Sequence, residues 1–347
     1  MRILILGGTR FIGPPTVRRL HAQGHTLALF HRTRTDNADL PAEVTHILGN
    51  RREDFEAHAP AFRDFEPDVV LDMFPITEAD AQAVMRLFTG YAGRVVAISS
   101  QDVYKAYGVI NGTESGPPVA VPLTEDSPLR DKLYPYRGPT PRADDDPMRW
   151  ADDYDKILVE RAVMGDPALP GTVLRLPMIY GPGDYQHRLY PYLKRMDDGR
   201  SAILLDDLGA GWLWTRDYVE NTAAAIALAA TDPRAAGRVY NLGEMPALTL
   251  AEWVRAIGEA AGWTGEIVIA PNPTLPEALQ SPPTLAQDLV ASSERIRAEL
   301  GYHEVVPQAE ALRRTVAWER AHPPQPLDPQ QYDYAAEDEA LYRLRQA

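Results

Sequence analysis

The sequence contains no cysteine and no long hydrophobic run, and each absence removes a class of protein. Without cysteine, the chain has no disulfide, thiolate nucleophile, iron–sulfur cluster or cysteine-ligated zinc, and it suits a reducing compartment. No apolar run approaches the roughly 18–20 residues of a membrane-spanning helix, and no signal peptide precedes the first predicted strand. We therefore expect a cytoplasmic protein with no membrane partner.

Basic residues are also in short supply. The chain has 35 Lys and Arg against 49 Asp and Glu, which gives a net charge of −14 and no basic block, so a nucleic-acid partner is disfavoured. The eight His residues show no metal-ligand spacing, so no metal site is predicted. The length of 347 residues and the 45% hydrophobic content fit a large α/β unit or a nucleotide-binding domain with a smaller lobe.

The most informative stretch is the opening, MRILILGGTRFIG. Residues 2–6 form a short apolar run, which is typical of a parallel strand buried on both faces. Gly7, Gly8 and Gly13 follow, and a helical pattern then begins with two prolines, which are tolerated in a first turn because its N–H groups lack helical partners. Strand, glycine turn and helix form the dinucleotide-binding fingerprint, in which main-chain N–H groups and a helix N-terminus meet a pyrophosphate.

Short apolar strands alternate with helical stretches along the rest of the chain. Further strands are predicted at 26–30, 44–48, 67–73, 94–99, 172–179 and 238–242, and helices at 79–88, 150–164, 219–230, 248–261, 289–300 and 309–319. This alternation predicts an α/β fold, a Rossmann-type doubly wound parallel sheet with a smaller C-terminal substrate-binding lobe. We assign residues 1–177 and 211–247 to the dinucleotide-binding domain, and residues 178–210 and 248–347 to the discontinuous substrate lobe.

Residues 108–149 are rich in Pro, Gly and Asp and carry little helical or strand pattern. A loop of this length in a compact domain usually has a function, so we expect a flap over the binding cleft.

The end of the second predicted strand favours NADP over NAD. A carboxylate at this place binds the adenosine ribose of NAD, but the chain has His31, Arg32, Thr33 and Arg34. Because an arginine fork suits the 2′-phosphate of NADP, Arg32 is a candidate cofactor contact. The alternative interpretation is a solvated basic loop, and NAD is the second candidate cofactor.

Six short motifs follow one another along the chain. They are GGTRFIG at 7–13, SSQDVY at 99–104, KILVE at 156–160, RLPMIYGP at 175–182, RDYV at 216–219 and VYNLG at 239–243. In this order they resemble the extended short-chain dehydrogenase/reductases, the NAD-dependent epimerase/dehydratase family. Arg10 replaces the family's middle glycine, as in an atypical branch that includes chloroplast RNA-binding proteins, and it would add a cation near an adenosine phosphate.

The resemblance implies where the cofactor lies. Asn50 stands where family members usually have an aspartate that binds the adenine, and an amide offers a different set of donors for this. Pro177 and Met178 match the segment whose backbone lies against the nicotinamide. The predicted cofactor contacts are Gly7, Gly8, Thr9, Arg10, Phe11, Ile12, Gly13, Arg32, Asn50, Lys156, Pro177 and Met178.

The family transfers hydride with a Ser or Thr, a Tyr, and a Lys four residues after that Tyr, a spacing that puts phenol and ammonium on one helix face. Ser100 matches the first of these and would polarise the substrate oxygen; its alternative role is to cap the loop after a strand. Lys156 matches the lysine, but the residue four before it is Asp152. The alternative for Lys156 is a surface ion-pair row with Asp152 and Glu160.

The residue that carries the proton is left open by the sequence. Tyr154 lies only two residues before Lys156, so it can act beside this lysine only if the helix begins irregularly there. Otherwise Tyr154 is a buried aromatic of a helix. The other candidates are Tyr104, Asp102 and Asp152.

These features predict an NAD(P)-dependent oxidoreductase or epimerase that acts on a secondary alcohol or ketone of a sugar-like substrate. A nucleotide sugar is among the candidate substrates, and a homodimer is compatible with the resemblance. The alternative is a catalytically degenerate dinucleotide-binding protein that acts as a binding or redox-sensing module, because position 152 carries no tyrosine. Fold alone does not decide between them.

Overall fold

A seven-stranded parallel sheet organises the N-terminal part of the computed structural model, which describes residues 1–32 and 40–346. Its strand order is β3-β2-β1-β4-β5-β6-β10. The strands are β1 (Arg2–Leu6), β2 (Thr26–His31), β3 (Thr45–Leu48), β4 (Val69–Asp72), β5 (Arg94–Ser100), β6 (Gly171–Leu176) and β10 (Arg238–Asn241). The order reverses between β1 and β4, and in such sheets ligands bind at this switch point, outside the carboxyl ends of the strands. The predicted doubly wound fold is confirmed.

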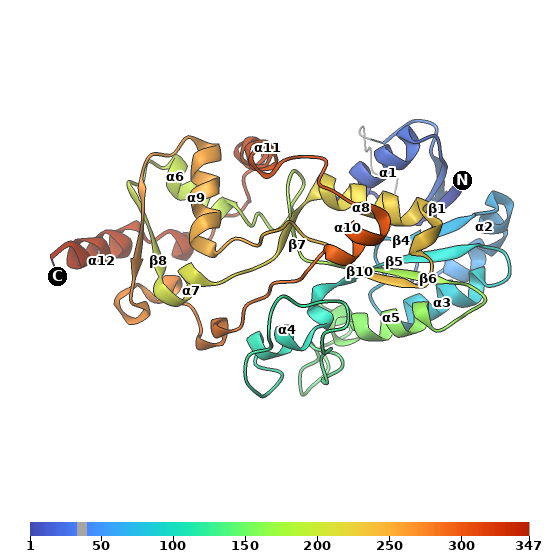
Figure 1. Cartoon of the computed structure of the whole chain (residues 1–347), viewed down its shortest axis with the longest axis horizontal. Coiled ribbons are helices and arrows are strands. Elements are labelled where there is room, and N and C mark those ends of the chain that lie inside the picture. Colours follow the sequence, from blue (N-terminus) through green and yellow to red (C-terminus); the bar gives the residue numbers. More distant parts are fainter. Residues whose placement is uncertain (33–39, 347) are drawn as a thin grey trace.

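Helices cover both faces of this sheet. Ile3 and Ile5 of β1 belong to the same core cluster as α1 (Gly13–Ala22) and α8 (Val219–Thr231), which lie above the sheet in Figure 1. Leu4 and Leu6 face the other way and pack with residues of the helices on the opposite face of the sheet. These are α2 (Ala59–Phe65), α3 (Glu78–Phe88) and α5 (Lys156–Met164). The alternation along β1 follows from the two-residue period of a strand.

A second group of elements lies to the left of the sheet in Figure 1. It contains α6 (Tyr190–Asp197), β8 (Ala202–Asp206), α7 (Asp207–Gly211), α9 (Leu250–Ala261), β11 (Glu266–Ala270), α11 (Gln308–Ala321) and α12 (Tyr334–Gln346). β8 and β11 form a parallel pair, and Thr249 caps α9. No helix in the described part of the chain is long and apolar enough to cross a membrane.

Two predicted elements are interrupted in the structure. The strand predicted at 172–179 ends at Leu176 and resumes as β7 (Met178–Tyr180), which pairs with β9 (Arg216–Tyr218), because Pro177 has no N–H to continue a ladder. The helix predicted at 150–164 is a short turn, Arg149–Asp152, followed by a break before α5.

One C-terminal prediction also needs correction. The helix predicted at 289–300 begins only at Glu294, as α10 (Glu294–Leu300), because Leu289 and Ala291 make isolated bridges to other segments. The tail after residue 323, which carries no clear pattern, ends in α12.

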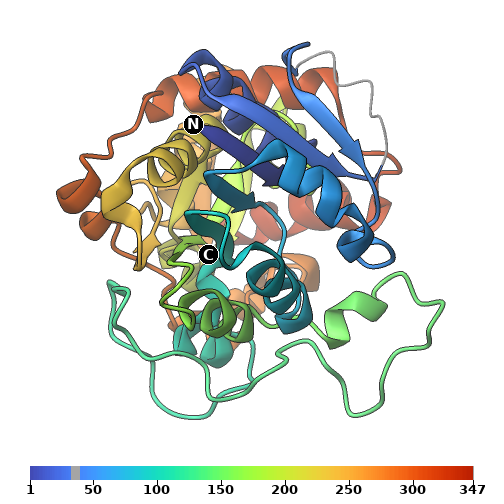
Figure 2. The same ribbon diagram turned by 90° about the vertical axis from the view of Figure 1, so that its right-hand side faces the viewer.

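The segment between α4 (Lys105–Ile110) and the turn at Arg149–Asp152 forms the long loops along the lower edge of Figure 2, drawn in teal to green. All of residues 111–148 are described, and they contain no helix or strand beyond isolated bridges. We call this segment the flap.

Candidate active site

The loop that joins β1 to α1 has the backbone that the glycine motif requires. Gly7 and Gly8 have φ of 92° and 84°, a left-handed conformation that favours glycine. A Cβ atom on Gly13 would lie 2.3 Å from the backbone carbonyl carbon of Gly8, so the helix can start this close to the turn only with glycine. Because main chain forms this wall of the site, the loop fits a dinucleotide pyrophosphate. Of the side chains here, Arg10 is exposed, and Thr9, Phe11 and Ile12 are half-buried.

The predicted contacts for the adenosine end lie at the ends of neighbouring strands. Arg32 is exposed directly after β2, whereas Thr33 and Arg34 lie outside the described residues. The Asn50 side chain donates a hydrogen bond to Glu53 (2.7 Å) and accepts one from the backbone N–H of Arg52 (3.1 Å). Asn50 therefore closes the turn after β3.

An arginine–carboxylate pair at the same edge was not predicted. Arg51 donates to both carboxylate oxygens of Asp72, at 2.6 and 2.5 Å, and its guanidinium also lies 3.4 Å from Asp80. Asp72 ends β4 and is 1% exposed. The partners are 21 residues apart and come from different strand ends, so no local pattern indicates the pair.

Lys156 is buried beneath the carboxyl ends of the central strands. Its Nζ donates to the carbonyl oxygens of Pro75 (2.5 Å), in the loop after β4, and Ile98 (3.0 Å), in β5. Burial lowers the pKa of Lys156 to about 8, although the charges of Asp102 and Asp72 oppose this. An ammonium has three N–H donors, and these two carbonyls account for two of them.

Tyr154 lies close to Lys156 because the helix begins irregularly. Asp155 is extended (φ −159°), caps α5 through its side chain, and leaves Tyr154 just outside the helix. The Tyr154 hydroxyl donates to Oδ2 of Asp102 at 2.6 Å, and its ring centroid lies 5.9 Å from the Nζ of Lys156. Burial, followed by the negative charge of Asp102, raises the pKa of Tyr154 well above its usual value. The interpretation of Tyr154 as a helix aromatic is wrong, although the ring is buried.

Ser100 ends β5 on the same side. It is half-buried, and its hydroxyl accepts a hydrogen bond from the backbone N–H of Asp102 (3.1 Å), so it caps the short turn that follows the strand. The Ser100 hydroxyl also interacts with Tyr154, where it opposes the rise of the tyrosine pKa. Capping and substrate polarisation are thus compatible roles for one hydroxyl.

Asp102 connects these groups. It is 7% exposed, and Oδ2 accepts hydrogen bonds from both Tyr154 and Tyr136 (3.2 Å), which comes from the flap. Its Oδ1 is buried and has no hydrogen-bond partner among the described residues. Burial raises the pKa of Asp102, and the hydrogen bond from Tyr154 and the charge of Arg130 oppose the rise.

The other two proton-carrier candidates have structural partners. The Tyr104 hydroxyl donates to Asn241 (2.7 Å) and accepts from Arg175 (2.9 Å), and burial raises its pKa to about 12. Asp152 accepts from the backbone N–H of Arg142 (2.7 Å), and this bond is the main reason why its pKa is lowered.

The alternative in which Lys156 belongs to a surface ion-pair row is wrong. Lys156 and Glu160 are each 6% exposed. Glu160 pairs with Arg175 at 2.8 Å, and Asp152 pairs with Arg142. The three residues share the i, i+4 spacing but face three different partners.

The nicotinamide segment predicted at Pro177 and Met178 connects β6 to β7. Pro177 is half-buried and Met178 is buried, at the carboxyl end of a strand that neighbours β5. Both positions are compatible with a backbone that lines the cofactor.

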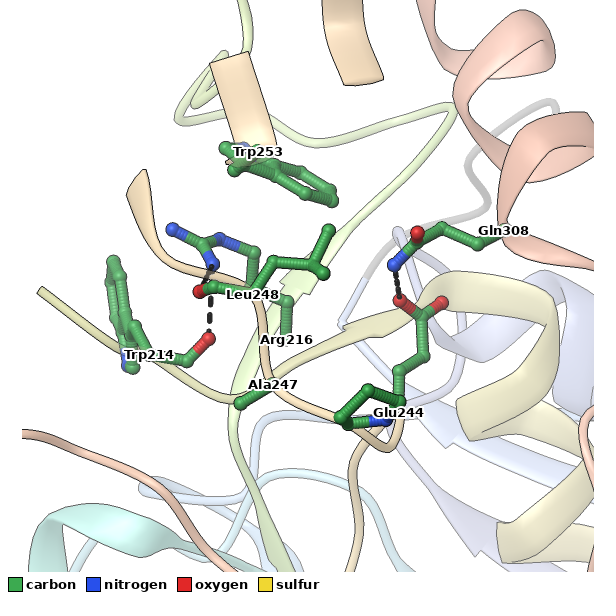
Figure 3. A pocket seen from close by; sticks show the side chains of 8 residues that line it. Trp214, Arg216, Glu244, Ala247, Leu248, Trp253 and Gln308 are labelled. Atoms are coloured by element: carbon green, nitrogen blue, oxygen red, sulfur yellow. Dashed lines mark hydrogen bonds between the residues drawn. The ribbon is translucent and has the colours of Figure 1, made fainter. Parts of the chain in front are cut away.

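A small pocket lies between two tryptophans (Figure 3). Arg216 donates to the backbone carbonyls of Trp214 (3.0 Å) and Leu248 (3.1 Å), and its guanidinium lies 4.7 Å from the ring centroid of Trp253. On the other side of the pocket, Gln308 donates to Glu244 (3.0 Å). The pocket has room for about one water molecule, so it is not a substrate site as it stands.

No family model matches the chain. A 2′-dehydrokanamycin reductase from Streptomyces kanamyceticus is 26% identical over 294 residues, which cover 83% of this chain and 74% of the relative. A 3-diazoavenalumate denitrifying reductase from a Streptomyces species is 27% identical over 327 residues, 88% of this chain and 97% of the relative.

Solved structures share the fold at lower identity. A UDP-glucose 4-epimerase from Thermotoga maritima, solved with UDP-glucose, gives a TM-score of 0.67 at 18% identity, covering 92% of this chain and 99% of the other. A dTDP-glucose 4,6-dehydratase from Bacillus anthracis, solved with NAD, gives 0.64 at 18% identity, covering 93% and 97%. These neighbours have the fold that the six motifs predict.

Proposed function

We propose that this chain is an NAD(P)-dependent oxidoreductase or epimerase acting on a secondary alcohol or ketone, and the fold that it shares with a solved epimerase and a solved dehydratase supports this. The observation that carries the proposal is the convergence of Ser100, Tyr154 and Lys156 at the sheet edge that also bears the glycine loop. Two sequence relatives are reductases, which supports the reaction class. Sugars and nucleotide sugars are the substrate class to test first, because one relative reduces a kanamycin derivative and the solved neighbours include a UDP-glucose epimerase.

The geometry supports the following assignment of residues to the cofactor. The Gly7–Gly13 loop would bind the pyrophosphate, Arg10 and Arg32 a 2′-phosphate, and the free donor of Lys156 a ribose hydroxyl. Bound NAD(P) supplies the hydride chemistry. Both exposed arginines support a preference for NADP.

The protein's own contribution is to orient the substrate oxygen and to move a proton. Ser100 donates to that oxygen, and Tyr154 exchanges a proton with it. Because the pKa of Tyr154 is raised, the phenol is protonated over the physiological range and is ready to protonate a carbonyl oxygen as hydride arrives.

The direct test combines binding with turnover. Purified protein is titrated with NADPH and with NADH, and ketones, sugars and nucleotide sugars are then screened for nicotinamide oxidation and for epimer formation. Tight binding with turnover supports an enzyme. Binding without any turnover would instead favour the alternative interpretation, a binding or redox-sensing module. The lack of tyrosine at position 152 is the reason for that alternative.

Gly13→Ala should remove most of the cofactor affinity. The added Cβ would lie within 2.3–2.5 Å of Gly8 backbone atoms, so the turn must open and the pyrophosphate contacts are displaced. We expect NADPH to bind at least about tenfold more weakly, since one lost charge-assisted hydrogen bond already has this effect. Gly211→Ala is the control for an added methyl group, because nothing lies within 4 Å of a Cβ there and its φ is not left-handed. Equal affinity of Gly13→Ala and wild type would show that the dinucleotide binds elsewhere.

Cofactor affinity should also depend on pH through Lys156. Its pKa is lowered to about 8, so the ammonium is charged below this value and becomes a neutral amine above it. NADPH should therefore bind about tenfold more weakly well above pH 8 than below it, because a hydrogen bond from a charged donor is replaced by a weaker one. Fluorescence titration across this range measures the change, and Lys156→Met should bind weakly with no step near this pH. A step that persists in Lys156→Met would assign the effect to another group.

A further inference from the structure

Each carbonyl reduction uses one proton, and the tyrosine proposed to give it is buried. Tyr154 is 8% exposed and donates to Asp102, which is 7% exposed. Lys156 is committed to two backbone carbonyls and is itself buried, so it does not connect Tyr154 to solvent. Tyr136 bonds to the same Asp102 oxygen, yet 41% of its surface is exposed.

We infer that Asp102 and Tyr136 carry the reaction proton between Tyr154 and solvent. The inference rests on the proposed function. For each ketone reduced, Tyr154 gives its hydroxyl proton to the substrate oxygen while the carbonyl carbon accepts hydride from reduced nicotinamide. Protonated Asp102 then restores the proton of Tyr154, Tyr136 restores that of Asp102, and water restores that of Tyr136. The sum is one ketone, one hydride and one solvent proton converted to one alcohol, and alcohol oxidation runs the same path in reverse.

The flap holds Tyr136 in this position through its arginines. Arg142 donates to the backbone carbonyl of Tyr136 (3.0 Å) and pairs with Asp152, while Arg137 donates to the backbone carbonyl of Asp152 (2.8 Å). Arg130, which is 4% exposed, donates to the backbone carbonyl of Asp102 (2.5 Å). Asp152, four residues before Lys156, therefore anchors the flap instead of carrying the proton, and the anchored flap presents a phenol to Asp102.

The groups around Asp102 allow it to exist in both protonation states. Tyr154 and Tyr136 donate to it, the charges of Arg130 and Lys156 act on it, and its own charge acts on the hydroxyl of Tyr107 on α4. Burial favours the protonated form, whereas the two phenols and the two cations favour the carboxylate. Both phenols bond to the same oxygen, Oδ2, so Asp102 receives and gives the proton at that atom.

The path can be tested on full-length protein without cofactor or substrate. The infrared carboxyl band of Asp102, identified by its loss in Asp102→Asn, is followed after a rapid change of pH. Tyr136→Phe should raise the pKa of Asp102 by about one unit, because a hydrogen bond to the carboxylate is lost. The same variant should also slow the protonation and deprotonation of Asp102 after the pH change by about tenfold or more, because the connection to solvent is broken.

Two further variants make the result specific. Tyr134→Phe removes a hydroxyl from the same flap but keeps the ring, whose centroid lies 3.8 Å from the guanidinium of Arg137. This variant should leave both the pKa of Asp102 and the rate unchanged. Arg142→Met keeps both phenols but frees the backbone of Tyr136, and should slow the equilibration as well. An unchanged rate in Tyr136→Phe, or equal slowing in Tyr134→Phe, would overturn the inference. Failure of the proposed function has a different signature, which is the absence of nicotinamide turnover in wild type whatever the infrared result.

Discussion

Tyr154→Phe should lower kcat by about 10²- to 10⁴-fold while NADPH affinity stays within about twofold of wild type. The variant keeps the ring, which packs against Tyr136 at 5.2 Å between centroids and against Trp150 at 6.1 Å, so the fold is not expected to change. It removes only the hydroxyl that bonds to Asp102. The substrate oxygen then has no group from which to take a proton.

The measurement is a steady-state rate with whichever ketone or sugar the screen identifies, together with an NADPH titration and an unfolding curve for each variant. Tyr104→Phe separates the two tyrosines, because the Tyr104 hydroxyl is bonded to Asn241 and Arg175. We expect Tyr104→Phe to lower stability more than the chemical step. Undiminished turnover in Tyr154→Phe would remove Tyr154 from the mechanism and return the role to Asp102 alone.

The pH dependence of the reduction should follow Asp102 in wild type. Only protonated Asp102 can restore the proton of Tyr154, so reductase activity is present below the pKa of Asp102 and is lost as pH rises through it. Since burial raises this pKa, the active range extends further toward neutral pH than for an exposed aspartate. This loss of activity is distinct from the weaker cofactor binding that we expect above pH 8.

Local signals in the sequence were enough to predict the sheet and the glycine loop. The branched apolar run at 2–6 and the glycines after it act over a few residues, and the structure has β1 at Arg2–Leu6 with left-handed φ at Gly7 and Gly8. A motif of this kind is set by backbone conformation, which depends mainly on the residues themselves. The capping box at Thr249 is predictable for the same reason.

The connections between distant residues could not be predicted in this way. Tyr154 and Asp102 are 52 residues apart, and Tyr136 and Asp102 are 34 apart, so only the folded flap brings them together. The i, i+4 spacing around Lys156 left a surface ion-pair row open as the alternative role. That alternative is wrong because burial, which spacing does not reveal, decides the partners. The Pro177 interruption was visible in the sequence, and a strand prediction that respected it would have ended at Leu176.

The second large effect concerns stability and the buried pair beneath the site. Glu160 and Arg175 have side chains that are 7% and 5% exposed and are joined at 2.8 Å, and Ser99 also donates to Glu160 (2.6 Å). Glu160→Gln keeps the shape but leaves the guanidinium of Arg175 buried without its counter-charge. Breaking such a pair lowers the free energy of unfolding by roughly 3–5 kcal/mol. We expect this loss in urea unfolding followed by tryptophan fluorescence.

The double variant Glu160→Leu, Arg175→Met distinguishes the cost of an unpaired charge from the value of the pair itself. Replacing both partners by apolar groups of similar volume is often neutral, so the double variant should recover most of the stability that Glu160→Gln loses. Arg175 also bonds to Tyr104 (2.9 Å), and Ser99 precedes Ser100, so the pair fixes the ends of β5 and β6 beside the reacting groups. If stability returns in the double variant but kcat does not, the ion pair serves to position Ser100. A Glu160→Gln variant as stable as wild type would show that Arg175 finds another counter-charge.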